Sequence, residues 1–136
     1  MRAVYERCVD ETMAAVSKAV VAAPASLDAR VEAGLREYIT FVTRDVRRAR
    51  IMNLEVRRAG DAVTKSRQRT VAAFARLIEK SAEEFPESLP EDPHLVVLGI
   101  IGAVQELLIE WVLAAKPPPI ERLIRAAVHI FRKSFA

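Results

Sequence analysis

Apolar residues recur at steps of three and four along most of this 136-residue chain, which is the spacing of one face of an α-helix. The pattern predicts helices over residues 2–23, 26–44, 45–56, 61–85 and 94–116, and a last helix from about residue 120. There is no sustained apolar–polar alternation, no hairpin turn pair and no internal repeat. We therefore expect an all-α protein, with one domain over residues 1–136 built as a single bundle of five to six helices.

Capping residues and prolines indicate where these helices begin and end. Ser26 follows the break at Pro24 and is suited to cap the second helix, with Asp28 in the first turn, where a carboxylate favours the helix dipole. Asp45 opens the short third segment, and the Pro-rich, acidic segment 86–93 is expected to be an exposed loop without helix.

The fifth predicted helix, residues 94–116, is unusual because it is apolar on every side from Leu95 to Val104. A helix of this kind must be covered all round. Gly99 and Gly102 let another backbone come close, although each glycine costs roughly 1 kcal/mol of helix propensity against alanine. We expect the chain's own bundle to cover one side of this helix and a second copy of the chain to cover the other.

The same helix is the one candidate for a membrane span in the sequence. Its uncharged run is about ten residues, against the roughly 20 that a span needs. The N-terminal segment is charged and lacks the apolar region of a signal peptide. The single cysteine, Cys8, excludes a disulfide framework and fits a reducing compartment. These features predict a soluble, cytoplasmic protein that does not enter a membrane.

The chain carries a net charge of +3, and its basic residues are concentrated in one segment. Nine Lys and Arg lie between residues 44 and 69: Arg44, Arg47, Arg48, Arg50, Arg57, Arg58, Lys65, Arg67 and Arg69. Such a segment can track phosphates. However, no aromatic residues are interleaved for stacking, and there is no Gly-rich loop or helix-turn-helix spacing. A solvated, Arg-rich face is the favoured interpretation.

Candidates for catalysis are few. Glu106 and Glu110 lie four residues apart on one helix face and could pair for proton transfer, but a solvated or interfacial face explains them as well. His94 and His129 lie at a helix start and a helix edge, so no nucleophile–base pair or zinc-type ligand spacing can be assembled. Cys8 is expected to be an inert core thiol. We expect neither an enzyme nor a bound cofactor or metal.

A binding pocket is the remaining possibility, because polar or soft side chains fall among apolar ones at positions that should point into the bundle. Helical bundles hold ligand sites in this way, with an apolar lining and a few polar groups. The alternative is a plain core with edge residues. The candidate ligand-binding residues are Thr12, Met13, Tyr38, Phe41, Met52, Asn53, Glu55, Phe74, Gln105 and Trp111.

The order of the elements resembles the C-terminal regulatory half of the tetracycline-repressor (TetR) family of transcriptional regulators. The stretch AVYERCVDETMAAVSKAV is similar to the long helix that connects this half to the DNA-binding head. The segment from Leu27 to Val56 contains the D-x-x-R-A-R-x-x-x-x-E stretch common in the next two helices. The helix LVVLGIIGAVQELLIEWVLA and the closing IERLIRAAVHIFRK, after a Pro-rich break, are similar to the last two helices of the family.

This resemblance covers essentially the whole chain and implies a homodimer whose last two helices form a four-helix bundle with the partner. It also implies a cavity for a small, largely apolar effector between the earlier helices and the penultimate one. The dimer contacts would come from Leu98, Gly99, Gly102, Ile109, Val112, Leu123, Ala127, Ile130 and Phe131.

One part of the family pattern is absent, namely the N-terminal helix-turn-helix head. The chain is therefore expected to be either a regulatory fragment of a longer repressor or a stand-alone domain, and to contact DNA only through a head that it lacks. The alternative from another class is a helical scaffold or protein-interaction bundle with no ligand cavity.

Overall fold

The computed structural model describes residues 2–55, 60–88 and 90–135, and every regular element in these ranges is a helix. The elements are α1 (Arg2–Ala22), α2 (Leu27–Thr43), α3 (Val46–Asn53), α4 (Asp61–Ala82), the short 3₁₀ helix η2 (Pro86–Ser88), α5 (Pro93–Leu113) and α6 (Ile120–Phe135). No strand occurs in the described ranges. The predicted all-α bundle of five to six helices is confirmed.

The helix starts follow the predicted caps. The Ser26 hydroxyl accepts a hydrogen bond of 3.1 Å from the Ala29 backbone N–H, and the Asp45 carboxylate accepts one of 2.9 Å from the Arg47 N–H. These bonds satisfy backbone donors that have no partner inside the helix.

Several helix boundaries differ from the prediction, and α3 ends at Asn53 rather than residue 56. Helix α4 ends at Ala82 rather than residue 85, and α5 ends at Leu113, ahead of the prolines at 117–119. The loop predicted to be free of helix contains the 3₁₀ turn Pro86–Ser88, in which the fixed φ of a proline suits the first position. Val56, which was assigned to the third helix, lies outside the described residues.

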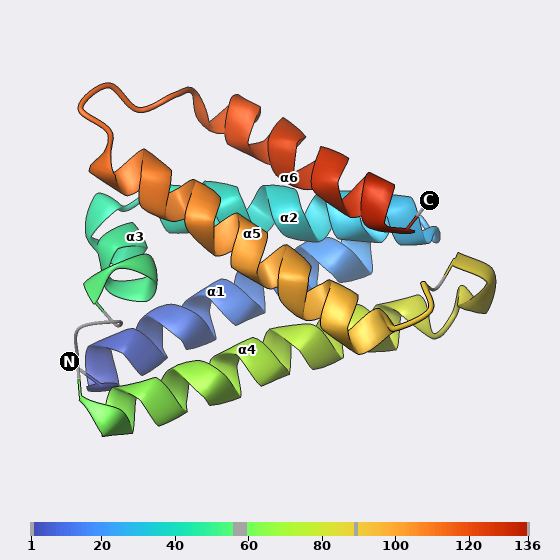
Figure 1. Ribbon diagram of the computed structural model, residues 1–136, viewed down its shortest axis with the longest axis horizontal. Helices are drawn as coiled ribbons and strands as arrows, with labels where there is room; N and C mark the ends of the chain where they lie inside the picture. Colours follow the sequence, from blue (N-terminus) through green and yellow to red (C-terminus); the bar gives the residue numbers. More distant parts are fainter. Residues whose placement is uncertain (1, 56–59, 89, 136) are drawn as a thin grey trace.

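The helices are arranged as two pairs with α5 lying across them (Figure 1). Helix α2 packs against α1 on one side and against α6 on the other, while α4 runs beside α1. Helix α5 crosses the bundle and contacts α3, α4 and α6. One buried cluster draws on α1, α2, α3, α5 and α6, and Ile39, Val42 and Leu108 are completely buried in it.

Two bidentate ion pairs fix α6 along α2. Arg132 donates from Nε and Nη2 to the two carboxylate oxygens of Asp28, at 2.7 and 2.9 Å. Arg36 donates in the same manner to Glu121, at 2.8 and 3.1 Å. The pairs lie near opposite ends of α6, at the start and in the middle of the antiparallel α2, so the register of α6 on α2 is set by charge as well as by apolar packing.

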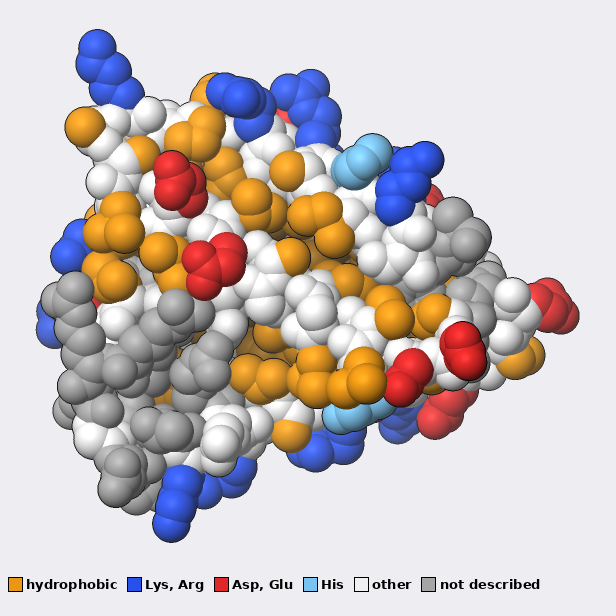
Figure 2. All heavy atoms as spheres, viewed as in Figure 1, with side chains coloured by type: hydrophobic (Ala, Val, Ile, Leu, Met, Phe, Trp, Pro, Cys, Tyr) orange, Lys and Arg blue, Asp and Glu red, His pale blue; other side chains and the backbone are white. Residues whose placement is uncertain are grey.

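Helix α5 buries only one stripe of its apolar surface in the protein. That stripe consists of Val97, Ile100, Val104 and Leu108, spaced three and four residues apart. Leu95 and Leu113 are 61% and 60% exposed. Figure 2 shows hydrophobic side chains spread over the face that α5 crosses, with most Lys and Arg at its edges. Within the described part of this chain, other helices therefore cover only one side of α5. The other side stays open, and we expected a second copy to cover it.

Among the described residues, α5 is also the one helix long and apolar enough to cross a membrane. Length and composition alone are weak evidence for a span, because a helix that packs in a soluble bundle passes the same test. The buried stripe of α5 packs on α3, α4 and α6.

Candidate ligand-binding pocket

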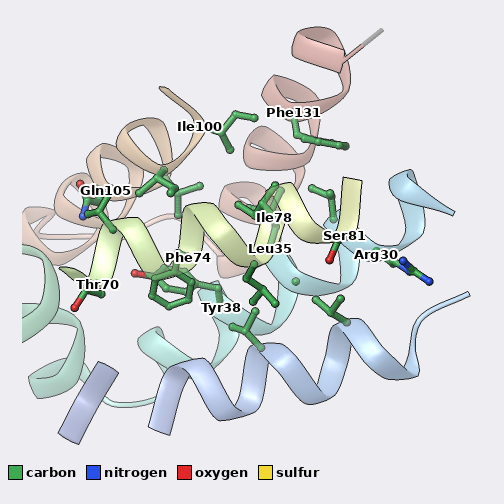
Figure 3. Close-up of a pocket in the computed structure, with 18 of the residues that line it drawn as sticks. Arg30, Leu35, Tyr38, Thr70, Phe74, Ile78, Ser81, Ile100, Gln105 and Phe131 are labelled. Carbon is green, nitrogen blue, oxygen red and sulfur yellow. The ribbon is translucent and has the colours of Figure 1, made fainter. Parts of the chain in front are cut away.

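An apolar pocket lies between α1, α2, α4 and α5, with a cavity of about 90 Å³ (Figure 3). A single ordered water needs only roughly 10–15 Å³ of such space. Two helices supply most of the wall with side chains at helical spacing. They are Arg30, Val31, Gly34, Leu35 and Tyr38 of α2, and Thr70, Val71, Phe74, Leu77, Ile78 and Ser81 of α4.

The pocket is elongated, and its polar groups lie at its ends. Figure 3 shows Arg30 and Ser81 at one end and Thr70 and Gln105 at the other, with Leu35 and Ile78 between them. Thr70 and Ser81 are eleven residues apart on α4, which corresponds to roughly 16 Å along the helix axis. The shape suits a long, narrow ligand better than a compact one.

Close packing of α1 on α2 forms one wall. A Cβ atom on Gly34 would lie 3.3 Å from Val20 Cγ2, so the absence of a side chain at this position allows the two helices to approach. On the side of α4, the rings of Tyr38 and Phe74 meet edge to face, with centroids 5.3 Å apart. This pair connects α2 to α4 toward the Thr70 end of the pocket.

Four of the ten residues proposed from the sequence line this pocket, namely Tyr38, Met52, Phe74 and Gln105. They come from α2, α3, α4 and α5, so the fold brings together side chains that are far apart in the sequence. Tyr38 and Gln105 also interact with other groups of the protein.

The other six residues do not line the pocket. Thr12 is completely buried, donates a 2.6 Å hydrogen bond to the Cys8 carbonyl oxygen and lies 3.6 Å from the sulfur of Met52. Asn53 is buried and donates from Nδ2 to the Ala49 carbonyl oxygen at 3.0 Å. The remaining four lie outside the lining: Met13 is half-buried on α1, Phe41 contacts Arg48, Glu55 is exposed and Trp111 packs against the core.

Several lining residues were not proposed from the sequence, above all Arg30, Thr70 and Ser81. For two of them, the sequence did contain a signal. Thr70 and Ser81 fall on the same α4 face as Phe74 and Ile78, where small polar residues interrupt an apolar stripe. Arg30 gave no such signal, because a charged residue near a helix start is ordinarily a surface residue.

The basic segment is only partly a solvated face. The Arg48 side chain is 13% exposed, and its guanidinium lies 3.9 Å from the centroid of the Phe41 ring and 3.7 Å from Glu11. Arg44, Arg47 and Arg50 are exposed, whereas Arg57, Arg58 and the side chain of Arg67 lie outside the described residues. Arg48 is therefore a packing residue rather than part of an open cationic surface.

Among the described residues, the titratable groups whose pKa is shifted lie outside the pocket lining. Burial raises the pKa of the Cys8 thiol above its ordinary value of 9.0, against a smaller lowering by Arg48. The Arg132 hydrogen bond lowers the pKa of Asp28, and that of Arg36 lowers the pKa of Glu121. Within the described ranges, no three His, Cys, Asp or Glu side chains gather as a metal site would require.

The nine residues proposed for a dimer interface fall into two groups. Leu123, Ala127 and Phe131 are at most 5% exposed and pack inside this chain, because the apolar stripe of α6 faces the bundle. The others are exposed or half-buried: Leu98, Gly99, Gly102, Ile109, Val112 and Ile130. Apart from the adjoining part of α5 itself, no described atom lies within 4 Å of the Cβ position at Gly99 or Gly102, so the glycine face of α5 is open in a single copy of the chain.

Comparison with known proteins gave no further guide to this pocket: no family model matches the chain, and neither does any curated protein or solved structure.

Proposed function

We propose that this chain is the effector-binding and dimerisation domain of a TetR-type transcriptional repressor, that it acts in the cytoplasm, and that it binds a small, largely apolar molecule. The observation that carries the proposal is the elongated apolar pocket between α1, α2, α4 and α5. An apolar pocket with a few polar groups at its ends is the usual form of a small-molecule site in a helical protein.

The position of α5 supports a regulatory role for the ligand. Its Ile100, Ile101 and Val104 line the pocket, while Gly99 and Gly102 lie on the open side of the same helix. A ligand in the pocket therefore contacts the helix that we propose to pack against a second copy. A ligand that prefers one position of α5 would bias the dimer between two arrangements, which in turn would set the spacing of DNA-binding heads in a full-length repressor.

The test is binding of a neutral apolar dye, N-phenyl-1-naphthylamine, followed by its fluorescence in the presence of the purified chain. We expect saturable binding to the wild type and a loss of binding in Ile78→Trp, because Ile78 lies at mid-pocket and an indole there fills the cavity. Val21→Trp is the matched control, since Val21 is 85% exposed and lies outside the lining. Circular dichroism checks that both variants keep their helix content.

The outcomes separate the proposal from its main alternative. Binding that is lost in Ile78→Trp and retained in Val21→Trp supports an effector site. A dye that does not bind the wild type, or that binds all three proteins alike, contradicts the effector site and favours the helical scaffold, whose last two helices would bind another protein.

A further inference from the structure

Arg30 is the one charged side chain among the described residues that line the pocket. It projects from the first turns of α2 and shares its end of the pocket with Ser81 (Figure 3). The Arg30 side chain is 20% exposed, so the guanidinium lies at the mouth, where water still reaches it. A charge can be kept there without the large desolvation cost of the pocket interior.

The Arg30 guanidinium is oriented by its neighbours, but only one of its nitrogens makes a hydrogen bond to a described residue. Its Nη1 donates to Glu84 Oε2 at 2.7 Å, and its carbon lies 5.3 Å from the centroid of the Phe85 ring. Within the described parts of the chain, Nε and Nη2 make no hydrogen bond. Glu84 is 62% exposed, and exposed pairs of this kind contribute little, so a bound carboxylate can compete with Glu84.

Beyond the Arg30 end, the pocket is lined mostly by apolar side chains. Leu35, Ile78 and Phe74 follow one another along the pocket from Arg30 toward Thr70. The polar groups at the far end, Thr70 and Gln105, already interact with other groups of the protein. The pocket therefore offers one charged position, at its mouth, and roughly 16 Å of largely apolar wall beyond it.

From this arrangement we infer that the pocket binds an elongated amphiphile with a single carboxylate, whose head group pairs with Arg30 and Ser81 and whose tail runs along α4 toward Phe74. The planar fork of an arginine matches a carboxylate through two parallel N–H donors, and a serine hydroxyl supplies a third donor. The inference names the ligand class of the site and so rests on the proposed function.

Three probes with the same alkyl chain test it: decanoate, 1-decanol and decyltrimethylammonium, each displacing N-phenyl-1-naphthylamine from the protein. Apolar burial alone would favour the alcohol over the charged probes. We expect instead that decanoate displaces the dye at about tenfold lower concentration than 1-decanol, which corresponds to about 1.4 kcal/mol. The cationic probe should be the weakest of the three.

Three variants of the ion pair make the test specific. Arg30→Gln should abolish the preference for decanoate and leave 1-decanol unchanged. Glu84→Gln should strengthen decanoate binding several-fold, because it removes the competing carboxylate. Arg30→Lys should keep part of the preference, since a lysine preserves the charge but not the fork.

If Arg30 only braces the fold through Glu84, both neutral variants will instead weaken all probes alike, and the inference is overturned. Equal displacement by decanoate and 1-decanol in the wild type also overturns it, but leaves the proposed effector site standing. Failure of the dye to bind the wild type overturns both.

Discussion

At the residue scale, Cys8 illustrates how burial rather than charge decides a side chain's chemistry. The thiol is half-buried on α1, and the loss of hydration outweighs the attraction of Arg48 for a thiolate, so the pKa is raised above 9.0. The reactive form of a cysteine is the thiolate. A raised pKa keeps Cys8 mostly in the less reactive protonated form at neutral pH, and the predicted inertness of this thiol can be measured.

The rate of alkylation by iodoacetamide checks this. We expect the midpoint of the native pH profile to lie above 9.0 and the native rate to lie well below the rate for the urea-unfolded chain at every pH. The unfolded chain is the control, because its thiol is hydrated and titrates near the ordinary value. A native profile whose midpoint lies at or below that of the unfolded chain would contradict a raised pKa.

At the element scale, α2 is the helix that organises the bundle, and its cap is a local contribution that can be measured separately. Ser26→Ala removes the hydrogen bond to the Ala29 N–H and should lower the free energy of unfolding by about 1 kcal/mol. Urea unfolding measures the change. Ser26→Asp is the control, since an aspartate can take over the cap, and it should retain most of the stability.

The contribution of the α2–α6 ion pairs to stability should depend on pH. The folded-state pKa values of Asp28 and Glu121 lie below the ordinary 3.8 and 4.5. Their contribution to stability is therefore present above those ordinary values and is lost as the pH falls through the lower folded-state values. We expect Arg132→Gln to be less stable than the wild type near neutral pH, with the difference shrinking in acid.

Urea unfolding of the two proteins across this pH range tests the expectation. Lys133→Gln is the matched control: it removes the same charge from the same turn of α6, and Lys133 forms no ion pair with a described residue. An Arg132→Gln deficit that stays constant down to the lowest pH would show that Asp28 does not supply the pH dependence.

At the scale of the whole molecule, the open glycine face of α5 is the strongest reason to expect a second copy. Native mass spectrometry at low micromolar concentration should show a species near twice 15.2 kDa. Any additional small mass would begin to identify a bound ligand. A monomer alone would mean that the apolar surface of α5 is covered in some other way.

Gly102→Leu tests the placement of that interface. Apart from the adjoining part of α5, no described residue lies within 4 Å of the Cβ position at Gly102, so the leucine should not clash inside one copy. Replacing a helix glycine gains up to roughly 1 kcal/mol of helix propensity. We therefore expect a well-folded chain that no longer dimerises. Ala22→Leu, at an exposed position on α1, should remain a dimer, and a dimer that survives Gly102→Leu would contradict the interface.

The sequence by itself determined the local features of this protein. The three- and four-residue spacing of apolar side chains, the caps at Ser26 and Asp45 and the prolines between helices predicted the helix order, because these signals act within a few residues. The helix ends at Ala82 and Leu113 were less well predicted, since they depend on packing beyond the last turn.

Only the tertiary structure decided which neighbour each apolar face meets. Helical spacing identifies a face, but it does not say what covers that face. Phe131 and Ala127 therefore looked available to a partner, whereas α6 turns them against its own bundle. In the same way, the approach of α1 at Gly34 and the position of α4 bring Arg30 to the mouth of an apolar pocket, a placement that no local pattern encodes.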